Sequence, residues 1–250
     1  MSVDKSKVKV ISASVKGPAH EHKGLECQDC HSFAFGKNFV AIVSDGAGSA
    51  KHGRIGAKNI CETLSDALKN ASMKNIRSCV EKAIESARDK LLFHRLNPSK
   101  SERDLHLFAA TVVGAVCSGN KGVFFHIGDG AGIALNGENY QQFVASFPQN
   151  GNFSCETFFY TMENWKENLR FTKFDNANTL FLMSDGVTGF SFSPDFCKLE
   201  PAFVKPINTF LQKEKNKTKA TAALNNTLNN VQAKKINSDD KTLLWARIEK

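Results

Sequence analysis

Apolar residues along this chain of 250 residues recur with two spacings, one typical of strands and one typical of helices. Short stretches in which apolar residues alternate with polar ones, or run together between turn residues, predict β-strands. Turn residues at 36–38, 118–122 and 136–137 indicate antiparallel hairpins between several of them. The predicted strands cover residues 8–15, 29–35, 39–44, 108–117, 123–127, 131–135, 179–183 and 243–248.

Other stretches repeat their apolar residues every three to four positions, the spacing of a helix with one buried face. This pattern predicts helices over residues 55–68 and 74–93, over part of 194–213, and over 219–231. Residues 146–178 lack a regular pattern, so we expect an irregular surface flap there. Strands in hairpin-linked groups and helices in pairs predict one α+β domain, residues 1–250, with mainly antiparallel sheets.

Composition narrows the class of protein. A hydrophobic fraction of 41% and a charged fraction of 23% are ordinary for a soluble globular domain. No apolar run reaches the ~18 residues that a membrane span needs, and the polar, basic N-terminus predicts no signal peptide. The seven cysteines are odd in number and scattered, which favours reduced thiols and a cytoplasmic location over a disulfide framework.

Two smaller features leave alternatives open. Cys27 and Cys30 form a C-x-x-C motif, but a zinc site needs a second pair, so buried thiols are the favoured interpretation. The net charge of +8 fits a solvated basic surface, or one that steers an anionic substrate such as a phosphoprotein. Basic residues are not interleaved with aromatic ones in any helix, and no nucleic-acid motif occurs, so we expect no nucleic-acid partner.

Short acidic motifs lie beside several predicted strands. Asp45 and Asp185 each stand in a Ser-Asp-Gly triplet after an apolar run, Asp129 follows another strand, Asp29 begins one, and Asp239-Asp240 precede the last. A single Asp-Gly is a common turn dipeptide, but independent turns would not each need an acid. Carboxylates beside buried strands are costly to desolvate unless their charge is compensated. Because oxygen ligands suit Mg²⁺ and Mn²⁺, the motifs predict a divalent metal site and metal-assisted hydrolysis.

In their order and spacing, these motifs resemble those of the metal-dependent protein phosphatases of type 2C. The segment Gly17-Pro18-Ala19-His20 is most similar to a bacterial branch of that family. The resemblance covers nearly the whole chain. Its motifs are Gln28-Asp29, Val43-Ser44-Asp45-Gly46-Ala47-Gly48, Ala109-Ala110-Thr111, Gly128-Asp129, Met183-Ser184-Asp185-Gly186 and Asp239-Asp240-Lys241-Thr242.

The resemblance implies a β-sandwich of two antiparallel sheets flanked by paired helices, with a two-metal centre that takes Mn²⁺ or Mg²⁺. Two such cations about 3.5–4 Å apart can clamp a phosphate and activate a water for in-line attack, so no protein nucleophile is needed. Carried over by position, the ligands would be Asp45 for both metals, Asp185 and Asp239 for the first, Asp29 and the Gly46 carbonyl for the second, and Asp129 with Asp185 for a third, weaker ion.

The sequence departs from the family pattern at two places that concern catalysis. Ala47 stands where animal members have a histidine after the first Asp-Gly, which removes a candidate general acid. No arginine precedes Asp29, so the nearby cationic candidates for binding phosphate are His20, His22 and Lys23. We assign a catalytic role to His20, together with Asp45 and Asp185, although a histidine in a loop is often only solvated or capping a turn.

The leading hypothesis is a serine/threonine phosphoprotein phosphatase with phosphorylated proteins as substrates and a cognate kinase as a further partner. The missing arginine and Ala47 motivate an alternative, a non-catalytic module that binds phosphoproteins or a kinase without hydrolysis. Retention of the acidic set opposes that alternative, because binding alone would not require it. A third interpretation is a metal-dependent phosphoesterase that acts on nucleotides or other small molecules.

Overall fold

The computed structural model describes residues 3–97, 99–149 and 157–249, and in them two five-stranded antiparallel sheets face each other. The first sheet has the order β1 (Val8–Val15), β10 (Lys241–Ile248), β9 (Thr179–Met183), β6 (Ala131–Leu135) and β7 (Phe143–Ser146). The second has the order β2 (Cys30–Phe35), β3 (Phe39–Ser44), β4 (Val112–Ser118), β5 (Lys121–Ile127) and β8 (Arg170–Phe174). The predicted β-sandwich is confirmed.

Central strands are apolar along their whole length because both of their faces are buried. In β3, Val40 and Ile42 pack on the helices outside the second sheet, whereas Phe39, Ala41 and Val43 pack between the two sheets. Successive side chains of a strand point to opposite faces, so such a strand needs apolar residues at every position. This explains why the pattern of residues 39–44 is a continuous apolar run.

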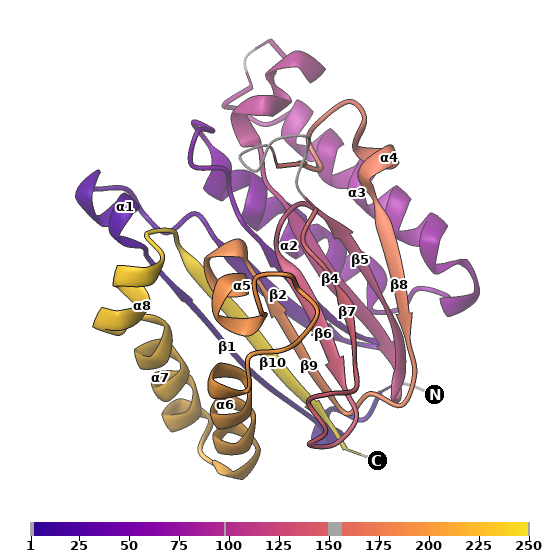
Figure 1. The fold of residues 1–250 in the computed structure, drawn as a ribbon. Helices are drawn as coiled ribbons and strands as arrows, with labels where there is room; N and C mark the ends of the chain where they lie inside the picture. The colour runs from indigo at the N-terminus through magenta and orange to yellow at the C-terminus, as the bar shows by residue number, and fades with distance from the viewer. Residues whose placement is uncertain (1–2, 98, 150–156, 250) are drawn as a thin grey trace.

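Helices cover the outer face of each sheet (Figure 1). α2 (Gly53–Leu68) and α3 (Ile76–Leu92) pack on the second sheet, and α5 (Asp185–Ser191), α6 (Pro201–Lys213) and α7 (Lys217–Leu228) pack on the first. The remaining helical segments are short: α1 (Pro18–His22), α4 (Trp165–Asn168), α8 (Val231–Ile236) and the 3₁₀ turns Lys5–Lys7, Met73–Asn75 and Glu102–Phe108. Of the helices in the described ranges, none combines the length and the apolar character of a transmembrane span.

The structure differs from the sequence prediction in five segments. The flap predicted at 146–178 contains α4 and the edge strand β8, while residues 150–156 of that segment lie outside the described residues. The strand predicted at 108–117 begins only at Val112, because Glu102–Phe108 forms a 3₁₀ turn. The helix predicted at 219–231 ends at Leu228, and α8 follows as a separate turn. Helices α1 and α5 were not predicted, since both are too short to show a helical period.

Candidate active site

The register of the second sheet brings three of the predicted acids to one edge. Cys30 pairs with Ser44, so Asp29 before β2 lies beside Asp45 after β3. β4 begins next to the end of β3 and also next to the end of β5. Asp129, two residues beyond β5, therefore reaches the same edge from the other side.

The register of the first sheet does the same for the remaining acids. Leu243 pairs with Met183, so the start of β10 lies beside the end of β9. Asp185 is the second residue after β9, and Asp239 lies two residues before β10. Antiparallel pairing thus explains why motifs far apart in the chain meet at one end of the sandwich.

A pocket of about 270 Å³ lies at this end, where the two sheets come together. Four of the predicted acids face into it, and Asp29 lies buried behind them against Asp45. Its rim includes the exposed residues Gly48 and Ser49. The lining residues are His20, Asp45, Gly46, Ala47, Gly48, Ser49, Thr111, Asp129, Thr157, Phe159, Asp185, Asp239 and Asp240.

The buried carboxylates oppose each other's ionisation. Burial raises the pKa of Asp45 well above its usual range, and the adjacent charges of Asp29 and Asp185 raise that pKa further. Burial also raises the pKa of Asp29 to about 6, although the Ser184 hydroxyl donates to its Oδ2 at 2.8 Å. The pKa of Asp185 is raised to about 7 by burial and next by the charge of Asp129. At neutral pH the cluster therefore lacks the positive charge that would let all of its carboxyl groups ionise.

The donor set fits divalent cations by its chemistry. Asp29, Asp129 and Asp185 each have a buried Oδ1 atom with no hydrogen-bond partner among the described residues, and such a carboxylate oxygen is a ready ligand for a hard cation. Within the described residues, no three His, Cys, Asp or Glu side chains already have the spacing of a preformed site. Cation binding therefore requires these side chains to rearrange. The bound cation would then relieve their mutual repulsion.

The Gly46 carbonyl lies beside the acids, where the backbone at Gly46 passes very close to the backbone at Gly53. A Cβ atom on Gly46 would lie 2.4 Å from the carbonyl carbon of Gly53, so only glycine fits. With its amide nitrogen turned toward them, Gln28 donates to the carbonyls of Gly46 and Ala47, both at 3.3 Å. A carbonyl oxygen has two lone pairs, so this contact leaves Gly46 one lone pair for an ion.

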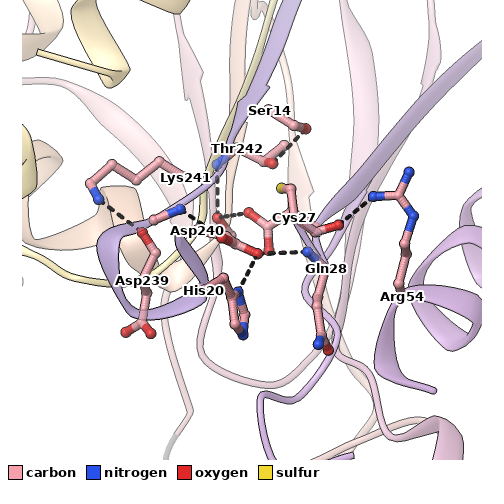
Figure 2. Close-up of polar contacts among 12 residues, drawn as sticks. Ser14, His20, Cys27, Gln28, Arg54, Asp239, Asp240, Lys241 and Thr242 are labelled. Atoms are coloured by element: carbon pink, nitrogen blue, oxygen red, sulfur yellow. Dashed lines mark hydrogen bonds and ion pairs between the residues drawn. The ribbon is translucent and has the colours of Figure 1, made fainter. Parts of the chain in front are cut away.

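Asp240 does not face the cluster as a free carboxylate but anchors the segment that carries His20. It is 3% exposed and accepts from the backbone N–H of Gly17 at 2.7 Å and of Gln28 at 2.6 Å. Its Oδ2 also contacts Nδ1 of His20 at 2.9 Å. Figure 2 shows Asp239 and the far end of the His20 ring extending to the same side, away from Asp240. Asp240 therefore anchors the turn that carries His20.

Several residues support the site although the sequence analysis assigned them no role. Thr111 receives the Asp45 backbone N–H on its hydroxyl at 3.0 Å and donates its own N–H to the Asp45 carbonyl at 2.8 Å. Thr157 donates its hydroxyl to Asp129. The buried Lys241 donates from Nζ to the carbonyl of Asp239 at 2.8 Å, which fixes the backbone of that residue. Thr111 and Lys241 belong to motifs of the family resemblance, but the sequence did not indicate which hydrogen bonds they make.

Other polar side chains near the site make structural contacts. Ser44 donates to the Thr111 carbonyl at 2.6 Å and Ser184 to Asp29, so both hydroxyls serve in positioning. His126 is fully buried in β5 against Ser146. The Cys27 and Cys30 thiols are half-buried and unbridged.

Comparison with known proteins places the fold in a defined family. The sequence model of protein phosphatase 2C matches residues 16–229. A serine/threonine phosphatase, stp, from Listeria monocytogenes serotype 4b (strain F2365) is 24% identical over 174 residues. That match covers 60% of this chain and 66% of the Listeria protein, so the chain spans just under two thirds of the length of this relative.

Solved structures show the same fold at low sequence identity. The serine/threonine phosphatase Stp1 from Staphylococcus aureus superposes with a TM-score of 0.64 at 14% identity, covering 97% of this chain and 96% of that one. The catalytic domain of the serine/threonine protein phosphatase PstP, solved in complex with two manganese ions, has a TM-score of 0.64 at 13% identity. It covers 97% of this chain and 99% of the PstP chain.

Proposed function

Because the chain belongs to the protein phosphatase 2C family, we propose that it hydrolyses phosphoserine and phosphothreonine side chains of proteins and requires Mn²⁺ or Mg²⁺. The observation that carries the proposal is the meeting of five carboxylates from five segments, three of them with an orphaned buried oxygen. A carboxylate set that repels itself is unstable without a cation. The manganese ions of the PstP structure support the same class of metal.

In this proposal the acids divide between the ions as the family resemblance implies. Asp45 lies between Asp29 and Asp185, which suits it to serve two ions at once. Asp239 is exposed at the pocket mouth and would complete one ion site, whereas the Gly46 carbonyl would complete the other. Asp129, whose charge acts on Asp185, would share a third ion with it.

Divalent cations bound there would offset the charge of the phosphate oxygens and make an attacking water more acidic. The protein's own residues hold the carboxylates in place. Thr111 fixes the backbone of Asp45, and Ser184 fixes Asp29. No serine of the site is needed as a nucleophile, because Ser44 and Ser184 are both committed to positioning bonds.

The chain's intact acidic cluster supports catalysis over the non-catalytic alternative, since phosphoprotein binding alone would not need repelling buried carboxylates. The open rim at Gly48 and Ser49 suits a phosphorylated side chain on a protein rather than an enclosed small molecule.

Phosphate release from a phosphothreonine peptide, and from p-nitrophenyl phosphate, tests the proposal. We expect turnover with Mn²⁺ that is lost in EDTA and in the variants Asp45→Asn and Asp185→Asn. Asp195→Asn is a matched control, because this exposed aspartate lies outside the site in a loop where it accepts from Ser193. Undiminished activity in EDTA would contradict the proposal. Tight phosphopeptide binding by calorimetry with no phosphate released would establish the non-catalytic alternative.

Three broader features belong to the same proposal. Residues 1–250 act as one catalytic domain, because strands from both ends of the chain share one sheet as β1 and β10. The protein works in the cytoplasm, which the unbridged cysteines of the described residues support, since free thiols persist in a reducing compartment. A serine/threonine kinase supplies its phosphorylated substrates.

A further inference from the structure

The imidazole of His20 is held in a defined orientation at the edge of the pocket. His20 lies in α1 and is 8% exposed, with Nδ1 2.9 Å from Oδ2 of Asp240. Asp240 is itself 3% exposed and already accepts backbone N–H groups from Gly17 and Gln28. A buried carboxylate that collects three donors stabilises a proton on each of them, so Nδ1 of His20 carries its proton toward Asp240.

The other ring nitrogen is thereby presented to the pocket. Among the described residues, and apart from Gly48 and its two chain neighbours, Nε2 of His20 is the only atom within 4 Å of the position that a Cβ on Gly48 would take, at 3.6 Å. Gly48 directly follows Ala47, the residue that stands in place of the histidine expected from the family pattern. The ring therefore reaches the loop after Asp45 from a different segment of the chain.

No other described residue that lines the pocket has a cationic form. His22 is exposed, two residues further along α1. Nζ of Lys241 is occupied by the carbonyls of Asn237 and Asp239. Arg54 donates to the Cys27 carbonyl and pairs with Glu26. Among the described residues that line the pocket, His20 is thus the one side chain that can carry a positive charge and give up a proton to a leaving group.

We propose that His20 is the general acid that protonates the leaving oxygen, and that Asp240 is the residue that positions its ring. This inference rests on the proposed phosphatase activity. As the phosphorus–oxygen bond to the serine side chain breaks, its electron pair goes to the serine oxygen, which takes the proton from Nε2. The attacking water forms the new phosphorus–oxygen bond, keeps one of its protons on the phosphate product and releases the other to solvent. His20 is left as neutral imidazole with Nδ1–H still on Asp240, and solvent returns the proton.

Two substrates and two substitutions separate proton transfer from simple phosphate binding. The p-nitrophenolate leaving group is a stable anion and needs no proton, whereas a serine alkoxide does. His20→Asn keeps an amide N–H near Nδ1 for Asp240 but removes the far end of the ring. His20→Gln places an N–H donor near Nε2 that can bind phosphate but cannot give up a proton.

For a general acid, both variants lose turnover of a phosphoserine peptide by about 100-fold and lose less than about threefold on p-nitrophenyl phosphate. The matched control His22→Gln keeps both activities. If His20→Asn instead loses activity equally on both substrates and His20→Gln restores it, His20 is a phosphate anchor and the proposal is overturned. Unchanged kcat on both substrates would also overturn it. If the wild-type protein turns over neither substrate with Mn²⁺, the proposed function itself fails.

The role of Asp240 has readouts that do not depend on turnover alone. Long-range ¹H–¹⁵N spectra of the wild-type protein should show His20 protonated at Nδ1, and a ring protonated only at Nε2 would overturn the assigned orientation. Asp240→Asn should lower kcat for the phosphoserine peptide by about tenfold with KM unchanged. It should leave the affinity for Mn²⁺, measured by calorimetry, as in the wild type. A loss of Mn²⁺ affinity equal to the loss of kcat would make Asp240 part of the metal site instead.

Discussion

Replacing Asp185 by Asn should make the metal-free protein more stable while abolishing its response to Mn²⁺. Burial, together with the charge of Asp129, raises the pKa of Asp185 from 3.8 to about 7. Below pH 3.8 the carboxyl is protonated in both the folded and the unfolded chain, and its burial then costs no folding stability through ionisation. Between these pKa values the folded chain keeps a proton that the unfolded chain has lost, so stability falls as pH rises, and the full cost is reached above the folded pKa.

The shift of about three pKa units corresponds to an upper value of about 4 kcal/mol at pH 8, at about 1.4 kcal/mol per unit. Neighbouring carboxylates share this cost and can rearrange, so we expect a gain of about 1–3 kcal/mol for the neutral asparagine. For a chain of this size the gain corresponds to a rise in Tm of roughly 2–12 °C. At pH 5 the gain should be less than half as large, because pH 5 lies only about one unit above the unfolded pKa of 3.8 and about two units below the folded pKa of about 7.

Thermal unfolding in EDTA and in excess Mn²⁺, each at pH 5 and pH 8, measures both effects. The wild-type Tm should rise with Mn²⁺ at pH 8, because a ligand that binds only the folded state stabilises it. Asp185→Asn should start from a higher Tm in EDTA and gain nothing from Mn²⁺. Asp239→Asn is the matched control, since this carboxylate is exposed and its removal should change the metal-free Tm little. A lower Tm of Asp185→Asn in EDTA, equal at both pH values, would refute the repelling cluster.

Three further predictions concern the same pocket. The affinity for Mn²⁺, measured by calorimetry, should weaken as pH falls from 8 to 5, because protons compete for Asp29 and Asp185, whose pKa values are about 6 and about 7; an affinity independent of pH would count against these carboxylates as ligands. Ser184→Ala should cost about 1–3 kcal/mol in urea unfolding at pH 8, because a buried carboxylate loses its 2.8 Å donor; no loss would show that the bond is without effect. Gly48→Ala should keep the Tm but slow phosphoserine turnover more than p-nitrophenyl phosphate turnover, because its methyl group would lie 3.6 Å from Nε2 of His20. Equal slowing on both substrates would oppose the placement of Nε2 beside the leaving oxygen.

The strands that the sequence predicts well are those buried on both faces. β3 and β9 are apolar at nearly every position and β10 from Leu243 to Ala246, because alternate side chains meet helices on one side and the facing sheet on the other. The edge strand β8 was missed, since only its last residue is fully buried and its polar positions resemble a loop. Its backbone pairing with β5 is a tertiary effect that local pattern does not carry.

The acids of the site were predictable because each one ends or begins a strand, and antiparallel register brings strand ends together. The supporting contacts were not. Asp240 meets His20 across 220 positions of sequence, and Ser184 meets Asp29 across 155. Such bonds depend on how the two sheets pack against each other, which no local spacing encodes. The same holds for the direction of the His20 ring, on which its proposed chemistry depends.

Anomalous diffraction at the manganese edge, from crystals grown with Mn²⁺, tests the central claim most directly. The account predicts at least two peaks in the pocket, bounded by the carboxylates of Asp29, Asp45, Asp185 and Asp239. Ions bound only elsewhere on the surface, with this pocket free of anomalous signal at saturating Mn²⁺, would contradict it.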